Sequence, residues 1–354
     1  MSIPIVDSHI HLFPASHLPT LSWYAPDSPL GAQHSVDEYR LATASSAETH
    51  LRGFIFLETD RISSIAEDEP DKGWAHALDE VSFLTRIITG APVAGEGHRE
   101  TDRALCLGFV PWAPVPGGPR ALEKYMGLVR ERTGTEAWGK VKGVRYLFQD
   151  KAAGLMVKQE VVDGLKWLGR QKLPFDLGVD VRQGGMWQLR EAVEMLRRAY
   201  EDVPEDERVT VVINHLCKPD LRLPDPSPAS VTTHPAFLEW SALVTSMAQY
   251  PTTYMKLSGG FSELPPLDAE TEPDLVALVE RMRPWTDVVF DTFGVERVLF
   301  GSDWPVCNIG GGGNEVSWRR WKSLVECLLE RRGLTTEQRK KVWSEVAIKA
   351  YNIA

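Results

Sequence analysis

Two histidines and one aspartate stand near opposite ends of the chain in settings that suit chemistry. His9 and His11 follow the first apolar run, residues 3–7, and Asp303 follows the last β-rich run, residues 297–300. Side chains two apart in a strand face the same way, so the two imidazoles are expected to converge on one point. Imidazole pairs bind metals or polarise carbonyl groups, and a nearby carboxylate can hold a metal or take a proton from water. We therefore interpret all three residues as catalytic, although an aspartate beside glycine and serine can also be a turn residue.

Three more polar side chains end apolar runs in the same way. His215 closes residues 209–214, and the cations Arg145 and Lys256 lie in two other runs. A lone histidine in such a place is more often a satisfied core or surface group, but its position at the end of the sixth run predicts a catalytic role. Either cation could be a snorkelling or salt-bridged charge. Because an unpaired cation between buried strands is costly, we expect both to contact substrate or a carboxylate.

The elements that must position these residues alternate along the chain. Eight short β-rich runs are separated by segments with helical spacing, which indicates a parallel sheet buried on both faces. At this length, eight repeats predict a single (β/α)8 TIM barrel of the α/β class spanning residues 1–354. An open doubly wound sheet is disfavoured because no glycine-rich phosphate turn follows a strand. The predicted strands are 3–7, 51–58, 104–110, 141–146, 174–180, 209–215, 253–257 and 297–300. The predicted helices are 75–89, 119–133, 159–171, 186–200, 235–250, 272–293, 316–332 and 335–353.

Long loops follow three of the strands, at residues 12–35, 216–234 and 304–317. In a barrel these βα loops form the rim of the active site. They carry Trp23, Tyr24 and Trp304, whose flat aromatic faces suit sugar-like rings, so we predict that these three residues bind substrate.

Composition narrows the classes of partner. The formal net charge is -10, which argues against nucleic acid or an anionic membrane as a main partner and favours a small molecule. The four cysteines show no paired spacing, no leader pattern precedes the first strand, and no apolar run is long enough to span a bilayer. We expect a cytoplasmic protein, whose oligomeric state the sequence does not indicate.

Five segments together resemble one family. They are DSHIH, GVRY, INHLCKPD, YMKLSGG and LFGSDWPV, and they occur in this order between residues 6 and 306. The set resembles the amidohydrolase superfamily, and within it the sugar-lactonase branch of L-rhamnono-gamma-lactonases, L-fuconolactonases and 2-pyrone-4,6-dicarboxylate lactonases. The loop after the first strand is most similar to fungal L-rhamnono-gamma-lactonases. The resemblance implies a hydrolytic centre of His9, His11, His215 and Asp303, with Arg145 and Lys256 near the substrate.

The sequence lacks the residues expected of a two-metal centre. Two-metal members of the superfamily use a carboxylated lysine on strand four and a histidine on strand five. Here Lys142 is badly phased for a bridge, and residues 174–180 contain no histidine, only the weaker candidates Asp176 and Asp180. The lactonase branch that the chain resembles includes members that work without metal, so we expect no obligatory cofactor. If one divalent ion such as zinc is present, its expected ligands are His9, His11 and Asp303.

These observations predict an enzyme that opens a sugar-derived aldonolactone, of the L-rhamnono-1,4-lactone type, as in L-rhamnose catabolism. Asp303 is expected to deprotonate a water while the histidines and a cation polarise the lactone carbonyl. The rim loops offer few arginines beyond Arg145, which favours a neutral ring over a dicarboxylated pyrone. The alternatives are a metal-dependent decarboxylase of a small aromatic acid and a barrel that binds a ligand without turning it over.

Overall fold

The computed structural model describes residues 3–44, 50–67 and 73–354. Among them are eight parallel strands, each followed by helical structure, as the alternation in the sequence predicts. All eight predicted strands are confirmed, with ends that differ by up to three residues. The strands are β1 Pro4–Ile10, β2 His50–Leu57, β3 Cys106–Val110, β4 Val144–Leu147, β5 Phe175–Gly178, β6 Val211–Ile213, β7 Thr253–Leu257 and β8 Val298–Phe300.

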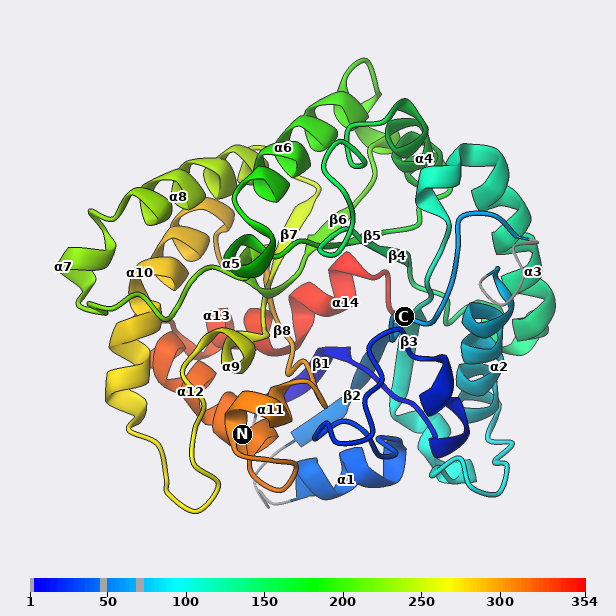
Figure 1. Cartoon of the computed structure of the whole chain (residues 1–354), viewed down its shortest axis with the longest axis horizontal. Helices are drawn as coiled ribbons and strands as arrows, with labels where there is room; N and C mark the ends of the chain where they lie inside the picture. Colours follow the sequence, from blue (N-terminus) through cyan, green and yellow to red (C-terminus); the bar gives the residue numbers. More distant parts are fainter. Residues whose placement is uncertain (1–2, 45–49, 68–72) are drawn as a thin grey trace.

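The strands form two parallel sheets that join into one ring (Figure 1). One sheet has the order β1-β2-β3 and the other β4-β5-β6-β7-β8. Between β3 and β4, backbone hydrogen bonds link Phe109 with Lys140 and Lys142. On the other side, the residues that follow β1 and β8 are linked by a bond of 2.7 Å from His11 N to Trp304 O. Consecutive strands are therefore neighbours all the way round, and the predicted barrel is confirmed.

Side chains alternate between the inside of the barrel and the layer under the helices. The apolar side chains inside the barrel form one cluster: Val6, Ile55, Leu57, Val110, Val212, Tyr254 and Leu299. Helix α14, red in Figure 1, contributes Val346 to this same cluster, and Tyr351, directly after the helix, belongs to it too, so this segment closes one end of the barrel. The catalytic candidates occupy the other end, where the strands terminate.

The helices form the outer layer. Every predicted helix is present, but the segment 335–353 is split into α13, a π-helical turn at Lys341–Glu345, and α14. The sequence did not predict α1, whose buried side is the narrow stripe Val36, Tyr39 and Ala42. The helices are α1 Val36–Ala44, α2 Ala75–Thr89, α3 Gly118–Trp138, α4 Gln159–Arg170, α5 Val181–Gly184, α6 Trp187–Tyr200, α7 Pro228–Val231, α8 Pro235–Ala248, α9 Gly260–Glu263, α10 Leu275–Phe293, α11 Cys307–Gly311, α12 Ser317–Arg331, α13 Thr336–Lys340 and α14 Val346–Ala350. In the described part of the chain, none of them has the length and apolar character needed to cross a membrane.

Candidate active site

A bulge in β1 turns its histidines toward the centre of the barrel. Asp7 pairs with Phe54 of β2 and Ile10 pairs with Phe56, so β1 holds one residue more than β2 over this stretch. An extra residue in one strand re-aims the side chains that follow it. His9 is thereby directed to the barrel interior, whereas the side chain of Asp7 lies under the outer helices.

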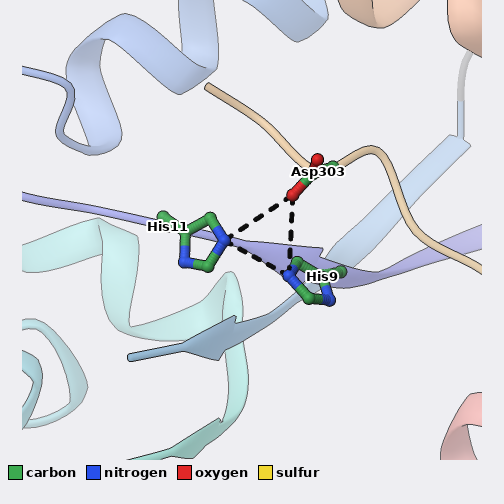
Figure 2. A group of neighbouring side chains, drawn as sticks. All are labelled: His9, His11 and Asp303. Atoms are coloured by element: carbon green, nitrogen blue, oxygen red, sulfur yellow. Dashed lines mark hydrogen bonds and ion pairs between the residues drawn. The ribbon is translucent and has the colours of Figure 1, made fainter. Parts of the chain in front are cut away.

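The two imidazoles meet as the sequence predicts. His9 Nε2 and His11 Nε2 are 3.2 Å apart, and both rings are buried (Figure 2). His11 Nδ1 lies 2.9 Å from the carbonyl oxygen of Leu57 and 3.0 Å from that of Glu58. Carbonyl oxygens only accept hydrogen bonds, so Nδ1 carries the proton and Nε2 presents its lone pair to the site.

Asp303 faces this pair from the loop after β8. Its Oδ1 lies 3.6 Å from Nε2 of His9 and 3.6 Å from Nε2 of His11 (Figure 2). Its backbone nitrogen donates a bond of 2.8 Å to the carbonyl of His9, and its φ of 62° is unusual for a residue other than glycine. Burial opposes ionisation of Asp303, but the surrounding His215, His11 and Lys218 outweigh it and lower the pKa of the carboxyl. Asp303 is therefore a carboxylate at neutral pH.

His215 completes the group from the end of β6. Its Nε2 lies 3.7 Å from Asp303 Oδ1, and its ring centroid is 4.5 Å from that of His9. Residues 215–218 all have positive φ angles, a left-handed turn that non-glycine residues adopt at a cost of about 1 kcal/mol each. Ser258 Oγ is 2.8 Å from Nδ1 and fixes the ring. Burial, and then nearby Lys218, lower the pKa of His215 to about 3 against the attraction of Asp303, so the ring is neutral at pH 7.

Beneath His9 lies a buried ion pair. Lys256 Nζ is 2.5 Å from Asp176 Oδ1 and 3.1 Å from His9 Nδ1, and Tyr351 donates a bond of 2.7 Å to Asp176 Oδ2. Both members of the pair are fully buried. Burial lowers the pKa of Lys256 to about 8. Lys256 therefore contacts a carboxylate and a catalytic candidate, and burial keeps it from solvent. Asp176, one of the weaker sequence candidates, is its partner.

A cavity of about 600 Å³ opens over these residues. Its size is within the usual range for small-molecule sites. His11, His215 and Asp303 line it, together with Arg145, which the sequence also predicted near the substrate. The remaining walls come mostly from the long loops, as expected for the rim of a barrel.

The predicted aromatic contacts separate into two kinds. Trp23 lines the cavity, and its Nε1 donates a bond of 2.9 Å to the carbonyl of Thr59. Tyr24 packs instead in a small apolar cluster with Phe13, Leu18 and Leu21. Trp304 is fully buried and donates a bond of 2.8 Å to Asn314 Oδ1. The cavity wall among the described residues includes Trp23 but neither Tyr24 nor Trp304, so these two support the loops.

The polar residues at the site that the sequence reasoning missed include Asp7, Glu58 and Lys218. Asp7 accepts a bond of 2.7 Å from the backbone nitrogen of Ser302, beside Asp303. Glu58 and Lys218 line the cavity. The signal for Lys218 was present, because it directly follows His215 in the INHLCKPD segment. Glu58 ends the second β-rich run, as His215 ends the sixth, and that position could have marked it.

The His9, His11 and Asp303 group fits one divalent ion. Their three nearest ligand atoms are 3.2 to 3.6 Å apart. Zinc bonds of 2.0–2.2 Å in a tetrahedron place ligand atoms roughly 3.4 Å from one another, which matches. In the described residues this is the one cluster of potential metal ligands. Lys142 donates to the carbonyl of Asn352 at the far end of the barrel, so it offers no bridge to a second ion.

Taken together, the barrel and its histidine-aspartate centre define a class of hydrolase. The family model described as "Amidohydrolase" matches residues 6–353, and this chain belongs to that family. It is 35% identical over 351 residues to an L-rhamnono-gamma-lactonase of Scheffersomyces stipitis, with 99% of this chain and 98% of that protein covered. It is also 27% identical to an L-fucono-1,5-lactonase of Burkholderia multivorans, with 77% of this chain and 76% of that protein covered.

Solved structures show the same fold. An amidohydrolase of Burkholderia multivorans with bound zinc superimposes with a TM-score of 0.69 and 23% identity, and the match covers 99% of each chain. At this identity the likeness supports the barrel architecture alone.

Proposed function

We propose that this protein hydrolyses a sugar-derived aldonolactone of the L-rhamnono-1,4-lactone type. The observation that carries the proposal is the position of Asp303, which borders the cavity and whose carboxylate lies within 3.7 Å of three imidazoles. The substrate class is supported by the identity of 35% over nearly the whole chain to an L-rhamnono-gamma-lactonase. By the same likeness, we place the enzyme in carbohydrate metabolism.

In the proposed reaction Asp303 is the general base. Asp303 Oδ1 takes a proton from a water as the water oxygen bonds to the lactone carbonyl carbon, and the carbonyl oxygen becomes an oxyanion. The oxyanion then re-forms the carbonyl, the bond from this carbon to the ring oxygen breaks, and the ring oxygen takes up the proton. The product is the open-chain hydroxy acid. The lowered pKa of Asp303 keeps the base ionised at neutral pH.

Neutral imidazoles and cations stabilise the charge that develops on the carbonyl oxygen. When Ser258 donates to His215 Nδ1, the ring proton lies on Nε2, beside Asp303 and toward the cavity. Lys218 borders the same cavity and is held 2.9 Å from Gln149 Oε1. One such donor is typically worth about 3 kcal/mol in the transition state. We assign these roles to His215 and Lys218, and the orientation of the reacting group to His9 and His11.

Substrate binding is assigned to Arg145 and Trp23, which border the cavity. Lys256 acts indirectly, by contacting Nδ1 of His9. Tyr24 and Trp304 hold the rim loops in place. A divalent ion such as zinc, where bound, would be held by His9, His11 and Asp303 and would polarise the carbonyl and lower the pKa of a water. We also propose that residues 1–354 form a single domain, of which 1–2, 45–49 and 68–72 lie outside the described residues. We also propose a cytoplasmic location, and the net charge of -10 supports the absence of a nucleic-acid or membrane partner.

The test is a pH-indicator assay on metal-quantified protein, with and without chelator. The substrates are L-rhamnono-1,4-lactone, L-fuconolactone, 2-pyrone-4,6-dicarboxylate and a 2,6-dihydroxybenzoate. Acid release from a sugar lactone supports the proposal. Carbon dioxide release from the aromatic acid, with no lactone hydrolysis, would establish the decarboxylase alternative, and tight binding without turnover would indicate a binding protein.

A further inference from the structure

Glu58 is a buried carboxyl group in the cavity wall that the proposed reaction does not use. It directly follows β2, and its side chain is fully buried from bulk solvent. It nevertheless borders the same cavity as Asp303 and His11. Its surroundings therefore decide what it can do for a bound molecule.

One oxygen of Glu58 is paired and the other is not. Oε2 accepts a bond of 2.6 Å from the backbone nitrogen of Asp60, which holds the side chain in place. Oε1 is buried and has no hydrogen-bond partner among the described residues. The side chain is therefore fixed with one oxygen left to pair.

Arg145 stands opposite this oxygen in a similar state. Its Nη1 donates a bond of 3.2 Å to the carbonyl of Glu58, which anchors the guanidinium. Its Nε lies 3.5 Å from Glu58 Oε1, too far for a good hydrogen bond, and it too has no partner in the described part of the chain. An acceptor and a donor thus lie side by side in the wall of the cavity.

Buried polar groups are normally hydrogen-bonded, so these two unpaired atoms are suited to bind a polar group of a ligand. A hydroxyl group fits both partners, because it donates one hydrogen bond and accepts another. Burial raises the pKa of Glu58 and the Arg145 guanidinium opposes this rise; the match is that of the carboxylate form, in which Oε1 accepts. A substrate with hydrogen in place of that hydroxyl would leave both groups unpaired, and sites of this kind discriminate strongly.

We infer that Glu58 Oε1 and Arg145 Nε bind one ring hydroxyl of the lactone, so that Glu58 is a specificity-determining residue. The inference rests on the proposed function and names the substrate group that Glu58 and Arg145 recognise, a ring hydroxyl. Polyhydroxylated lactones are selected here over lactones that lack that hydroxyl. Arg145 contributes the donor and Glu58 the acceptor.

The test compares L-rhamnono-1,4-lactone with its monodeoxy ring analogues. For the wild-type enzyme, kcat/KM is expected to fall by about 100-fold for one analogue and by much less for the others. In E58Q the amide oxygen must face Asp60 N, which places the amide NH₂ beside Arg145 Nε, donor against donor. This variant is expected to lose about 30-fold on the full lactone and to treat the critical analogue within about threefold of it.

D60N is the matched control. Asp60 lines the same cavity two residues away, but its carboxylate already accepts from Ser22 Oγ. It should retain the wild-type discrimination. Thermal unfolding confirms that each variant is folded.

Two results would overturn the inference: a wild-type enzyme that uses all monodeoxy lactones within about threefold of one another, or a folded E58Q with undiminished discrimination. The first result needs no variant. Both leave the proposed function standing, because the wild-type enzyme hydrolyses the lactone. A wild-type enzyme that hydrolyses no sugar lactone would instead refute the proposed function, and this inference with it.

Discussion

The backbone nitrogen of Asp303 donates a hydrogen bond of 2.8 Å to the carbonyl oxygen of His9. This bond joins the last strand of the barrel to the first at the level of the site. The carboxylate and the imidazole therefore keep their places through the main chain as well as through side-chain contacts. Closure of the barrel and assembly of the catalytic centre are the same structural event.

Asp7 is predicted to hold this junction. It accepts from Ser302 N at 2.7 Å, from Trp318 Nε1 at 2.8 Å and from Tyr39 Oη at 3.0 Å, so its carboxylate faces donors only. In D7N an amide NH₂ must face one of them. We expect a loss of about 2 kcal/mol in the free energy of unfolding and a fall in kcat with KM little changed. Urea unfolding and steady-state kinetics measure both, with Y39F, which removes one donor, as the milder control. An unchanged kcat in a folded D7N would contradict the role.

The pair of Lys256 and Asp176 offers a second prediction. In K256M a buried carboxylate loses its cation, and we expect a loss of about 3 kcal/mol in stability. The double variant K256M/D176N removes both charges and should recover most of that loss. Activity should stay low in the double variant, because Lys256 no longer contacts His9 Nδ1. Recovery of activity together with stability would show that the pair is merely structural.

Two histidines, His17 and His215, are predicted to lower stability in mild acid, against the opposite contribution of Glu58, whose pKa burial raises to about 8. The pKa of His17 is lowered to about 4, by burial first and then by Arg61, and that of His215 is lowered to about 3, again by burial first. Unfolding returns each to about 6.5, so below that pH the unfolded chain binds more protons than the folded one. Between about pH 7 and pH 5.5 each histidine should remove roughly 1 kcal/mol from the free energy of unfolding. Urea titrations at both values test this. H17Q, remote from the catalytic group, should lose less between them than the wild-type protein, and an equal loss would contradict the assignment.

Zinc, when supplied, is predicted to bind with a stoichiometry of one. Calorimetry on metal-free protein should show at least a tenfold weaker affinity in H11Q, which lacks one ligand of the His9, His11 and Asp303 group. H234N is the control, because His234 caps α8 far along the chain and outside that group. Two tightly bound ions per chain, or H11Q binding as well as H234N, would contradict the single-ion site.

Much of the fold and the core of the site follow from the sequence, because they depend on periodicity and order. The strand ends place His9, His11, His215 and Asp303 around one opening once eight parallel strands close. What the sequence could not give is set by local geometry and by distant partners. The bulge that separates Asp7 from His9 depends on pairing with β2.

The same limit applies to the supporting residues. The contact of Asp176 with Tyr351 joins residues 175 positions apart and requires α14 to enter the barrel. Trp304 and Tyr24 were placed in the rim loops, but whether an aromatic ring in such a loop faces the cavity or the core is decided by packing. Residue type alone does not carry that information.

The most direct test of the account is the hydrolysis of L-rhamnono-1,4-lactone by wild-type and D303N protein side by side, followed by pH-stat titration at neutral pH. The D303N substitution removes the negative charge and the general base but keeps the shape of the side chain. The account predicts rapid acid release by the wild-type protein, a loss of at least about 10³-fold in kcat in D303N, and little change in thermal unfolding. A folded D303N that retains activity within about tenfold of the wild-type value would contradict it.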